Sequence, residues 1–324
     1  MISWPPVLQI SNTGEFLLMF RYILKRLLIC IPVLIIVVLI IFWMLNVLPG
    51  NPIEQMMGEK LKPDVVARLT EKWGLNDPWI VRFGRYIRDV FLHGDFGDSY
   101  KKNRPVIDLI GESFPNTVKL AISSALVAWI IGIPAGIISA VKKNSFLDRF
   151  FMGIALCGIS MPVFWAAMLL QFIFGYKLGI LPISGYSSWK HMILPAIVLG
   201  WSSSGSIARL TRSNLLEAMR NDYIRTARAK GLNESGVIWK HALKNSMMPV
   251  VTTMAIQFAG LLSGATITET VFGIGGIGRL TVNALQTRDI PLLQGSIIFS
   301  TALIMIGNLV ADIMYSFLDP RVRV

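Results

Sequence analysis

The sequence predicts an all-α polytopic membrane protein with six transmembrane helices. Hydrophobic residues make up 53% of the 324 positions and charged residues only 15%, well below the usual quarter. A transmembrane helix needs about 20 apolar residues. Six uncharged runs approach or exceed that length: 27–48, 120–141, 150–176, 192–208, 246–268 and 291–311. Runs of this length exclude a large soluble enzyme with buried helices.

The net charge of +12 is better explained by membrane topology than by nucleic-acid binding. Basic residues gather in the short loops 142–149 and 209–245, whereas 177–191 and 269–290 carry two each. Because basic residues of short loops stay on the cytoplasmic side, we expect both termini to be cytoplasmic. A cleaved signal peptide is disfavoured because the first apolar run is too long and lacks a small-residue cleavage site.

These runs divide the chain into four parts. We expect an N-terminal extension at 1–20, a first transmembrane helix at 21–48, an extracytoplasmic loop at 49–119 and a five-helix core at 120–324. In the outer loop, helical spacing predicts two short amphipathic helices, one from Pro63 to Trp73 and one capped by Asp77 and ended by Gly94. They would form a lid on the outer face; the alternative is a segment that lies on lipid.

The cytoplasmic loop 209–248 is unusually ordered for a connection between membrane helices. Asn221 is a good N-cap, Asp222 suits the positive end of the helix dipole and Gly231 is a good left-handed C-cap, which predicts a helix over 222–230. Ala227 and Gly231 are four residues apart, so a small-residue face is expected to pack against another protein. The alternative is a helix attracted to lipid headgroups by its basic residues.

Catalytic and cofactor motifs are missing. The sequence has no G-x-x-x-x-G-K-[ST] nucleotide loop, no Ser-His-Asp arrangement and no HExxH. The glycines of 273–278 match a dinucleotide fingerprint only loosely and follow a membrane run rather than a strand. Cys30 and Cys157 lie in apolar runs, and the histidines are scattered, so we assign no metal site. Glu269, Asn308 and Asp312 lie near run ends and are expected to pair with neighbouring helices or to sit at the membrane interface.

The segment 222–232 resembles the EAA loop of ABC-importer permeases. Arg225-Thr226-Ala227 stands where the family has Glu-Ala-Ala, so the acidic residue and the first alanine are missing, but Gly231 is in place. This segment is similar to the dipeptide, oligopeptide and nickel transport subgroup, as are 48–52, 93–99, 104–106, 133–136 and 269–272. The resemblance covers about 19–324. Gly275-Gly276 replaces the Pro-Gly that relatives often carry.

The resemblance implies a type I ABC-importer permease fold in the inner membrane of a bacterium or archaeon. It also implies a second homologous permease, two cytoplasmic ATPases that hold ATP and Mg, and an extracytoplasmic solute-binding protein, with no cofactor or catalysis in this chain. The residues implied to couple to the ATPases are Asp222, Tyr223, Arg225, Thr226, Ala227, Arg228, Ala229 and Gly231. Those implied at an outer gate or binding-protein contact are Glu269, Phe272, Gly275, Gly276 and Gly278.

The cargo implied is a di- or oligopeptide, with nickel, glutathione or an opine as alternatives. An ion-coupled secondary transporter is a second class, but it would be expected to show broken helices with ionisable groups near the bilayer midplane, and the runs here are almost free of them. A membrane enzyme is a third class, distinguished by turnover of the isolated subunit.

Overall fold

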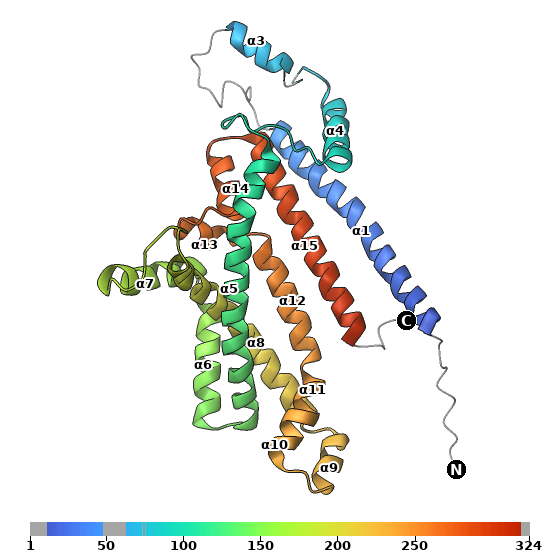
Figure 1. The fold of residues 1–324 in the computed structure, drawn as a ribbon, viewed down its shortest axis with the longest axis vertical. Helices are drawn as coiled ribbons and strands as arrows, with labels where there is room; N and C mark the ends of the chain where they lie inside the picture. The colour runs from blue at the N-terminus through green and yellow to red at the C-terminus, as the bar shows by residue number, and fades with distance from the viewer. Residues whose placement is uncertain (1–11, 48–62, 73, 75, 319–324) are drawn as a thin grey trace.

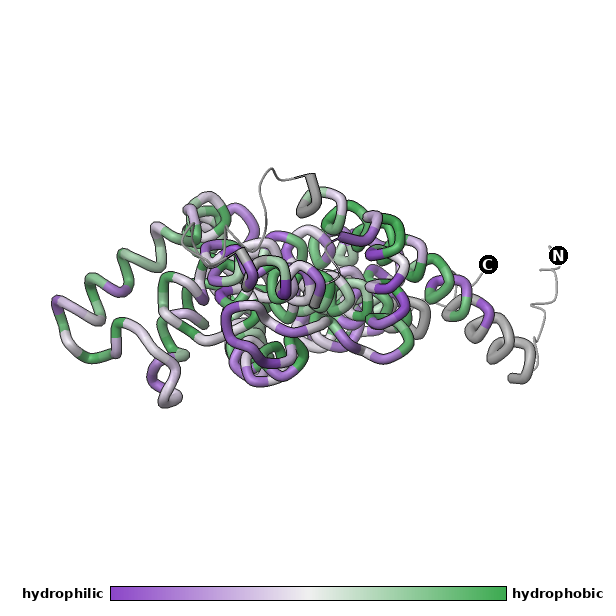
Figure 2. Tube along the Cα trace, turned by 90° about the horizontal axis from the view of Figure 1, so that it is seen from above, coloured by the Kyte–Doolittle hydropathy of each residue, from purple (hydrophilic) through white to green (hydrophobic). Residues whose placement is uncertain are grey.

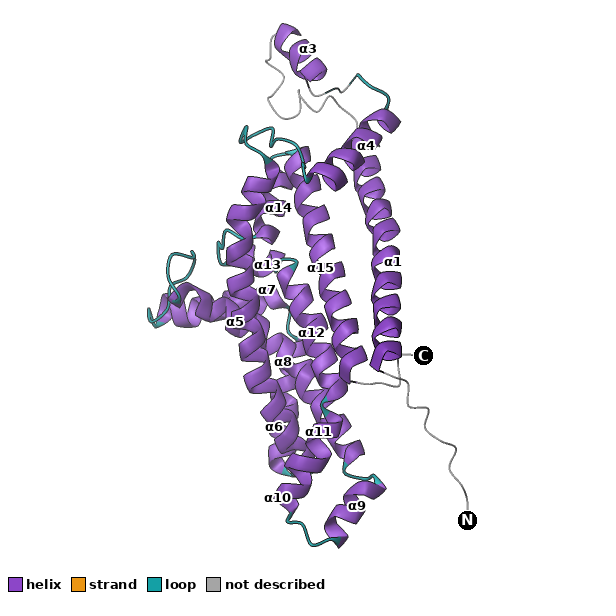
Figure 3. Cartoon of the chain, turned by 45° about the vertical axis from the view of Figure 1, so that its right-hand side comes forward, coloured by secondary structure: helices purple, strands orange, loops and turns teal. Residues whose placement is uncertain are grey.

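The computed structural model describes residues 12–47, 63–72, 74 and 76–318, and this part of the chain folds into helices and connecting loops without a β-strand. The helices form an elongated bundle (Figure 1). One end carries α3 (Pro63–Lys72) and α4 (Trp79–Arg88), and the opposite end carries α9 (Asp222–Ala229) and α10 (Glu234–Gly236). Figure 3 shows the same separation from another side. The prediction of an all-α membrane protein is confirmed.

Four of the six predicted runs form long apolar helices. They are α1 (Asn12–Val47), α5 (Val106–Val141), α8 (Lys190–Ala218) and α15 (Ile290–Leu318). The fifth run contains α12 (Met248–Leu262), which is shorter. Helix α5 begins at Val106, so the predicted boundary of the outer loop at 119 falls inside a helix. The count of six spans stays a prediction.

The third run is broken by a sharp bend. It is divided into α6 (Phe146–Ser160), α7 (Val163–Leu170) and the π-helix η2 (Gln171–Lys177), with a bend of 106° after α6. Pro162 causes the break, because proline disfavours a helical conformation in the preceding residue. Met161 is accordingly extended, with ψ of 128°.

Small residues bring α5 and α8 close together at the centre of the bundle. A Cβ on Gly132 would lie 2.8 Å from the Ser204 carbonyl oxygen, and one on Gly136 would lie 2.6 Å from the Ala208 carbonyl oxygen. Glycine is therefore required for the helices to approach this closely. Such packing is typical of membrane helices, whose association depends on van der Waals contact rather than on the hydrophobic effect.

Helix α1 packs on the outside of α15, and the α7–η2 segment leaves the bundle on the opposite side (Figures 1 and 2). Arg26 of α1 forms a salt bridge of 2.8 Å with Asp312 of α15, so Asp312 pairs with a neighbouring helix as expected. Half of the described side chains of α1 are exposed large hydrophobics. An exposed apolar surface of this kind is suited to contact with lipid.

The two helices predicted in the outer loop are present. Helix α4 is continued by the π-helix η1 (Asp89–His93), and Gly94 ends it in the left-handed conformation, with φ of +66°. Pro78 rather than Asp77 is the N-cap; the Asp77 carboxylate instead accepts a hydrogen bond of 2.6 Å from Arg85. Trp73, the predicted end of the first helix, lies outside the described residues.

The remaining helices complete the two ends of the bundle. The loop 209–248 continues from α10 into the π-helix η3 (Val237–Ala242) and α11 (Leu243–Ser246). At the other end, α13 (Thr266–Val271) and α14 (Ile277–Gln286) follow α12 and lead into α15. The two groups of predicted site residues therefore lie far apart in the bundle (Figure 1).

Candidate functional site

Helix α9 lies where the sequence predicts it, between an extended Asn221 with ψ of 153° and a left-handed Gly231 with φ of +77°. The Leu232 N–H donates to the Ala227 carbonyl oxygen across this glycine, at 3.4 Å, as in a left-handed helix cap. A Cβ on Gly231 would meet no described atom within 4 Å, so its conformation rather than close packing explains the glycine.

The buried face of α9 is formed by Ile224 and Ala227, which are 0% and 5% exposed. They belong to one apolar cluster with residues from the ends of α5 and α8 nearest α9 and from η3: Ile137, Ala140, Leu215, Ala218, Val237 and Ala242. This corrects the expectation that Ala227 faces a partner, because its methyl group packs against its own chain. Helix α9 is thus anchored to the bundle by side-chain packing.

The opposite face of α9 is open to solvent and carries the other predicted coupling residues: Asp222, Tyr223, Arg225, Thr226, Arg228, Ala229 and Gly231. The Arg225 side chain is 76% exposed and lies 3.3 Å from Asp222. Arg228 instead binds Glu234 of α10 at 2.6 Å, which ties the end of α9 to the next helix. Arg225 is therefore the more available cation for a partner.

An ion pair that the sequence interpretation missed fixes the turn between α5 and α6 to α8. Arg212 donates to both oxygens of Asp148 at 2.8 Å, and the Asn144 N–H donates to the same carboxylate at 2.9 Å. The hydrogen bonds from Arg212 hold the pKa of the Asp148 carboxyl below its usual value. The two residues are 64 positions apart, so sequence spacing gives no sign of the pair.

At the other end of the core, the buried carboxylate of Glu269 joins α13, α14 and α5. It is 0% exposed, and it accepts hydrogen bonds from the Thr117 hydroxyl at 2.8 Å and the Arg279 N–H at 3.0 Å. The Thr117 oxygen in turn accepts from the Ile277 N–H at 2.9 Å. A Cβ on Gly276 would lie 2.5 Å from this carboxylate, so the turn passes directly over it.

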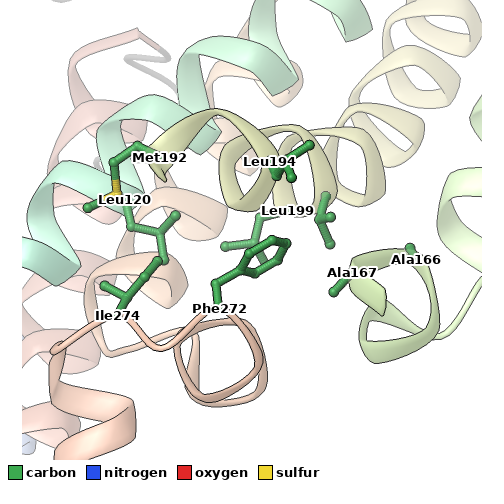
Figure 4. Close-up of a cluster of buried hydrophobic side chains, with 9 residues drawn as sticks. Leu120, Ala166, Ala167, Met192, Leu194, Leu199, Phe272 and Ile274 are labelled. Atoms are coloured by element: carbon green, nitrogen blue, oxygen red, sulfur yellow. The ribbon is translucent and has the colours of Figure 1, made fainter. Parts of the chain in front are cut away.

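The glycine turn after α13 is packed into the core. Phe272 and Ile274 belong to an apolar cluster with side chains of α5, α7 and α8, which include Leu120, Ala167, Met192 and Leu199 (Figure 4). The five residues expected at the outer gate are all buried or half-buried. In this conformation the turn between α13 and α14 is held against α5 by Glu269 and Thr117, and we call this contact the latch. Its residues present little surface for contact with another protein.

A second buried carboxylate connects the outer loop to α15. The Asp289 carboxylate accepts hydrogen bonds from the Ser99 hydroxyl at 2.5 Å and from the Tyr100 and Lys101 N–H groups at 3.1 and 3.3 Å. Burial raises the pKa of the Tyr100 phenol to about 12; the nearby charge of Arg82 opposes this shift and that of Asp289 adds to it. The segment 93–99, which resembles the permease subgroup, thus ends in Ser99, whose hydrogen bond to Asp289 fixes the outer loop to the start of α15.

The chain belongs to the family of binding-protein-dependent transport system inner membrane components, whose members are transport permeases rather than enzymes. It matches this family over residues 132–324 and the family's N-terminal membrane component over 19–121. Members are multi-pass inner membrane subunits of ABC importers, which implies partner ATPases and a binding protein.

Similar proteins include the dipeptide transport system permease protein DppB of Alkalihalophilus pseudofirmus, which is 41% identical over 94% of this chain and 100% of its own length. The glutathione transport system permease protein GsiC is 43% identical in Salmonella paratyphi A and 42% identical in Escherichia coli K12, over 94% of this chain and 99% of each relative. The fold resembles a chain of the inward-facing MetNI methionine ABC transporter, with a TM-score of 0.55, 17% identity and coverage of 66% of this chain and 97% of that chain.

Proposed function

We propose that this chain is one of two permease subunits of an importer for short peptides, and that partner ATPases act on it through α9. The observation that carries the proposal is the two-sided character of α9: Ile224 and Ala227 fix it to the bundle, while Tyr223, Thr226 and Ala229 are exposed on another face. A helix anchored on one side and open on the other can pass a partner's movement to the bundle.

The anchoring cluster supports a mechanism for this coupling. Ile224 packs with Leu215 of α8, Ile137 of α5 and Val237 of η3, so a push on α9 acts on the ends of two long helices at once. Packed side chains resist deformation, and such a cluster moves as a unit. ATP and Mg held by the partner ATPases would supply the energy, and closure of the ATPases would rock α5 and α8.

The same proposal gives the orientation of the subunit. The end that carries α9 would face the cytoplasm together with both termini, because the short loops at this end hold more basic residues than the short loops at the other end. The outer loop would face the binding protein. The latch around Glu269 would form part of the outer gate, which opens when the α13–α14 turn separates from Thr117 of α5.

The cargo class is supported by the relatives rather than by a pocket in this chain. One relative is named for dipeptides and another for glutathione, which is itself a tripeptide. Short peptides are therefore the shared chemistry, and glutathione is the second candidate.

The assembled importer with its own binding protein should take up a labelled dipeptide, and unlabelled di- and tripeptides should compete. Reduced glutathione is tested in the same assay. Competition by glutathione alone would favour the second candidate, whereas competition by nickel ions and by no peptide would overturn the peptide assignment.

A further inference from the structure

Helix α4 of the outer loop packs against the end of α1 (Figures 1 and 3). The Phe42 ring of α1 meets the Phe83 ring edge-on, with 5.4 Å between the centroids, and the Tyr86 ring lies 6.3 Å away. The guanidinium carbon of Arg82 lies 5.8 Å from the centre of the same Phe42 ring. These contacts bury Phe42 and fix the level along α1 at which α4 lies.

That level lies within the thickness of the hydrocarbon core. The segment Leu24–Met44 is long and apolar enough to cross a membrane, and Arg26 near its start pairs with Asp312. Phe42 is 16 residues beyond Arg26. At 1.5 Å per residue it lies at most about 24 Å from this ion pair, whereas the hydrocarbon core is roughly 30 Å thick. Because an ion pair belongs at the edge of the hydrocarbon or beyond it, Phe42 does not reach past the opposite edge.

The surface of α1 around Phe42 supports this placement. Ile40, Trp43 and Met44 lie within one turn of Phe42, and each is at least half exposed. The open apolar surface of α1 therefore continues past its contact with α4. An open apolar side chain of α4 at this level meets acyl chains rather than water.

Helix α4 has an open side that is apolar. Ile80, Gly84 and Ile87 follow at i, i+4 and i+7, so they share one side of the helix. Ile80 is 64% exposed, Gly84 is exposed and Ile87 is half-buried. The π-helix η1 continues this segment with Phe91 and Leu92, which are also exposed.

Basic side chains of α4 lie away from this apolar side. Arg82 and Arg85 are two and five residues after Ile80, which places them about 200° and 140° around the helix from it. Arg85 is exposed and pairs with the Asp77 carboxylate at 2.6 Å. A helix with one apolar and one basic side is suited to lie in the plane of the membrane interface, with its apolar side about 5–10 Å below the boundary of headgroups and acyl chains.

We propose that α4 is an interfacial helix, whose apolar side formed by Ile80, Ile87 and Phe91 inserts among phospholipid acyl chains while Arg85 stays in the headgroup layer. The leaflet is the outer one in the orientation proposed above. A soluble binding protein is a poor cover for this side, because it approaches from water and the side chains lie at the level of Phe42. Since Ser99 and Tyr100 also bond to Asp289, lipid at α4 would hold the outer loop at a second point.

The test is electron paramagnetic resonance with a nitroxide attached to Ile80→Cys, to Phe91→Cys, or to Arg85→Cys as the control on the other side of the helix. Cys30 and Cys157 are replaced first. Each labelled chain is measured in liposomes, both within the complete importer and by itself. Recovery of the second permease and the ATPases with the labelled chain tests the proposed function. Collisions of the nitroxide with oxygen, which concentrates among acyl chains, and with a water-soluble nickel chelate test the position of α4.

The labels at Ile80 and Phe91 should collide severalfold more with oxygen than with the nickel chelate, and the label at Arg85 should show the reverse. Both patterns should be the same with and without the other subunits, because lipid covers this side of α4. Ready access of the nickel chelate to both apolar positions would overturn the inference by showing that water covers them. Exclusion of both reagents within the complete importer would overturn it as well, because a protein would then be the cover.

Discussion

The inward position of Ala227 determines how α9 can be tested. Its methyl group is enclosed by its own chain, so Ala227→Trp overfills the cluster around Ile224, and overpacking typically costs about 1–3 kcal/mol. We expect this variant to melt at a lower temperature in detergent. Ala229→Trp, on the exposed face of the same helix, should melt normally but recover less of the ATPases on co-purification. Normal melting of the first variant together with full ATPase recovery by the second would contradict the assigned faces.

Glu269 is the acceptor for both Thr117 and the Arg279 N–H. Glu269→Ala removes that acceptor and leaves buried donors unpaired, and each buried unsatisfied group costs about 1–3 kcal/mol. We expect a clear drop in melting temperature and a leaky importer that hydrolyses ATP without its binding protein. Thr270→Ala, at the exposed neighbouring position, is the control and should behave like the wild type. Equal stability of the two variants would exclude the latch.

Helix α9 shows which parts of the molecule the sequence could predict. Its start after Asn221 and its left-handed end at Gly231 follow from local signals and are confirmed. The prediction that the Ala227–Gly231 face of α9 contacts a partner was wrong, because Gly231 lies beyond the end of the helix and does not define its surface. Ile224 and Ala227, at i and i+3, carried the correct signal, since together they form the apolar stripe.

Local sequence signals did not predict the bend in the third run or the partners of the buried carboxylates, for different reasons. An uninterrupted apolar run has no polar face to mark a change of direction, although Met161-Pro162 marks a helix boundary. Thr117 and Glu269 are 152 positions apart, and Ser99 and Asp289 are 190 apart. Pairs at such distances are created by packing of α5, α13 and α15, which the local pattern of one sequence does not reveal.

The Asp148–Arg212 pair makes the stability of the fold depend on pH in a predictable way. Because Arg212 lowers the pKa of the folded carboxyl, the pair stabilises the fold above the ordinary Asp value of about 4 and is lost as pH falls through the lower folded value. The difference in melting temperature between wild type and Asp148→Asn should therefore be constant from about pH 8 to 5 and shrink only below about 4. Asp64→Asn, on exposed α3, is the control and should show little difference. A difference that disappears already near pH 6 would contradict the pair.

The orientation of the whole molecule can be tested by cysteine labelling in a variant without Cys30 and Cys157. Exposed positions that avoid left-handed backbone are Lys102 in the outer loop, Lys143 after α5 and Ser235 in α10. Lys143→Cys and Ser235→Cys should react with an impermeant maleimide only after the membrane is opened, and Lys102→Cys should react in intact cells. The reverse pattern at any of the three would refute the proposed topology.

The central claim is that this chain is a permease driven by partner ATPases. It is tested most directly by uptake of a labelled dipeptide into proteoliposomes that contain this chain, the second permease and both ATPases, with the binding protein in the outer medium and ATP inside. We expect accumulation that requires ATP and every subunit. Ala229→Trp should abolish this accumulation while the level of this chain in the liposomes stays normal. Accumulation by this chain alone, driven by an ion gradient and unaffected by removal of ATP, would contradict the central claim.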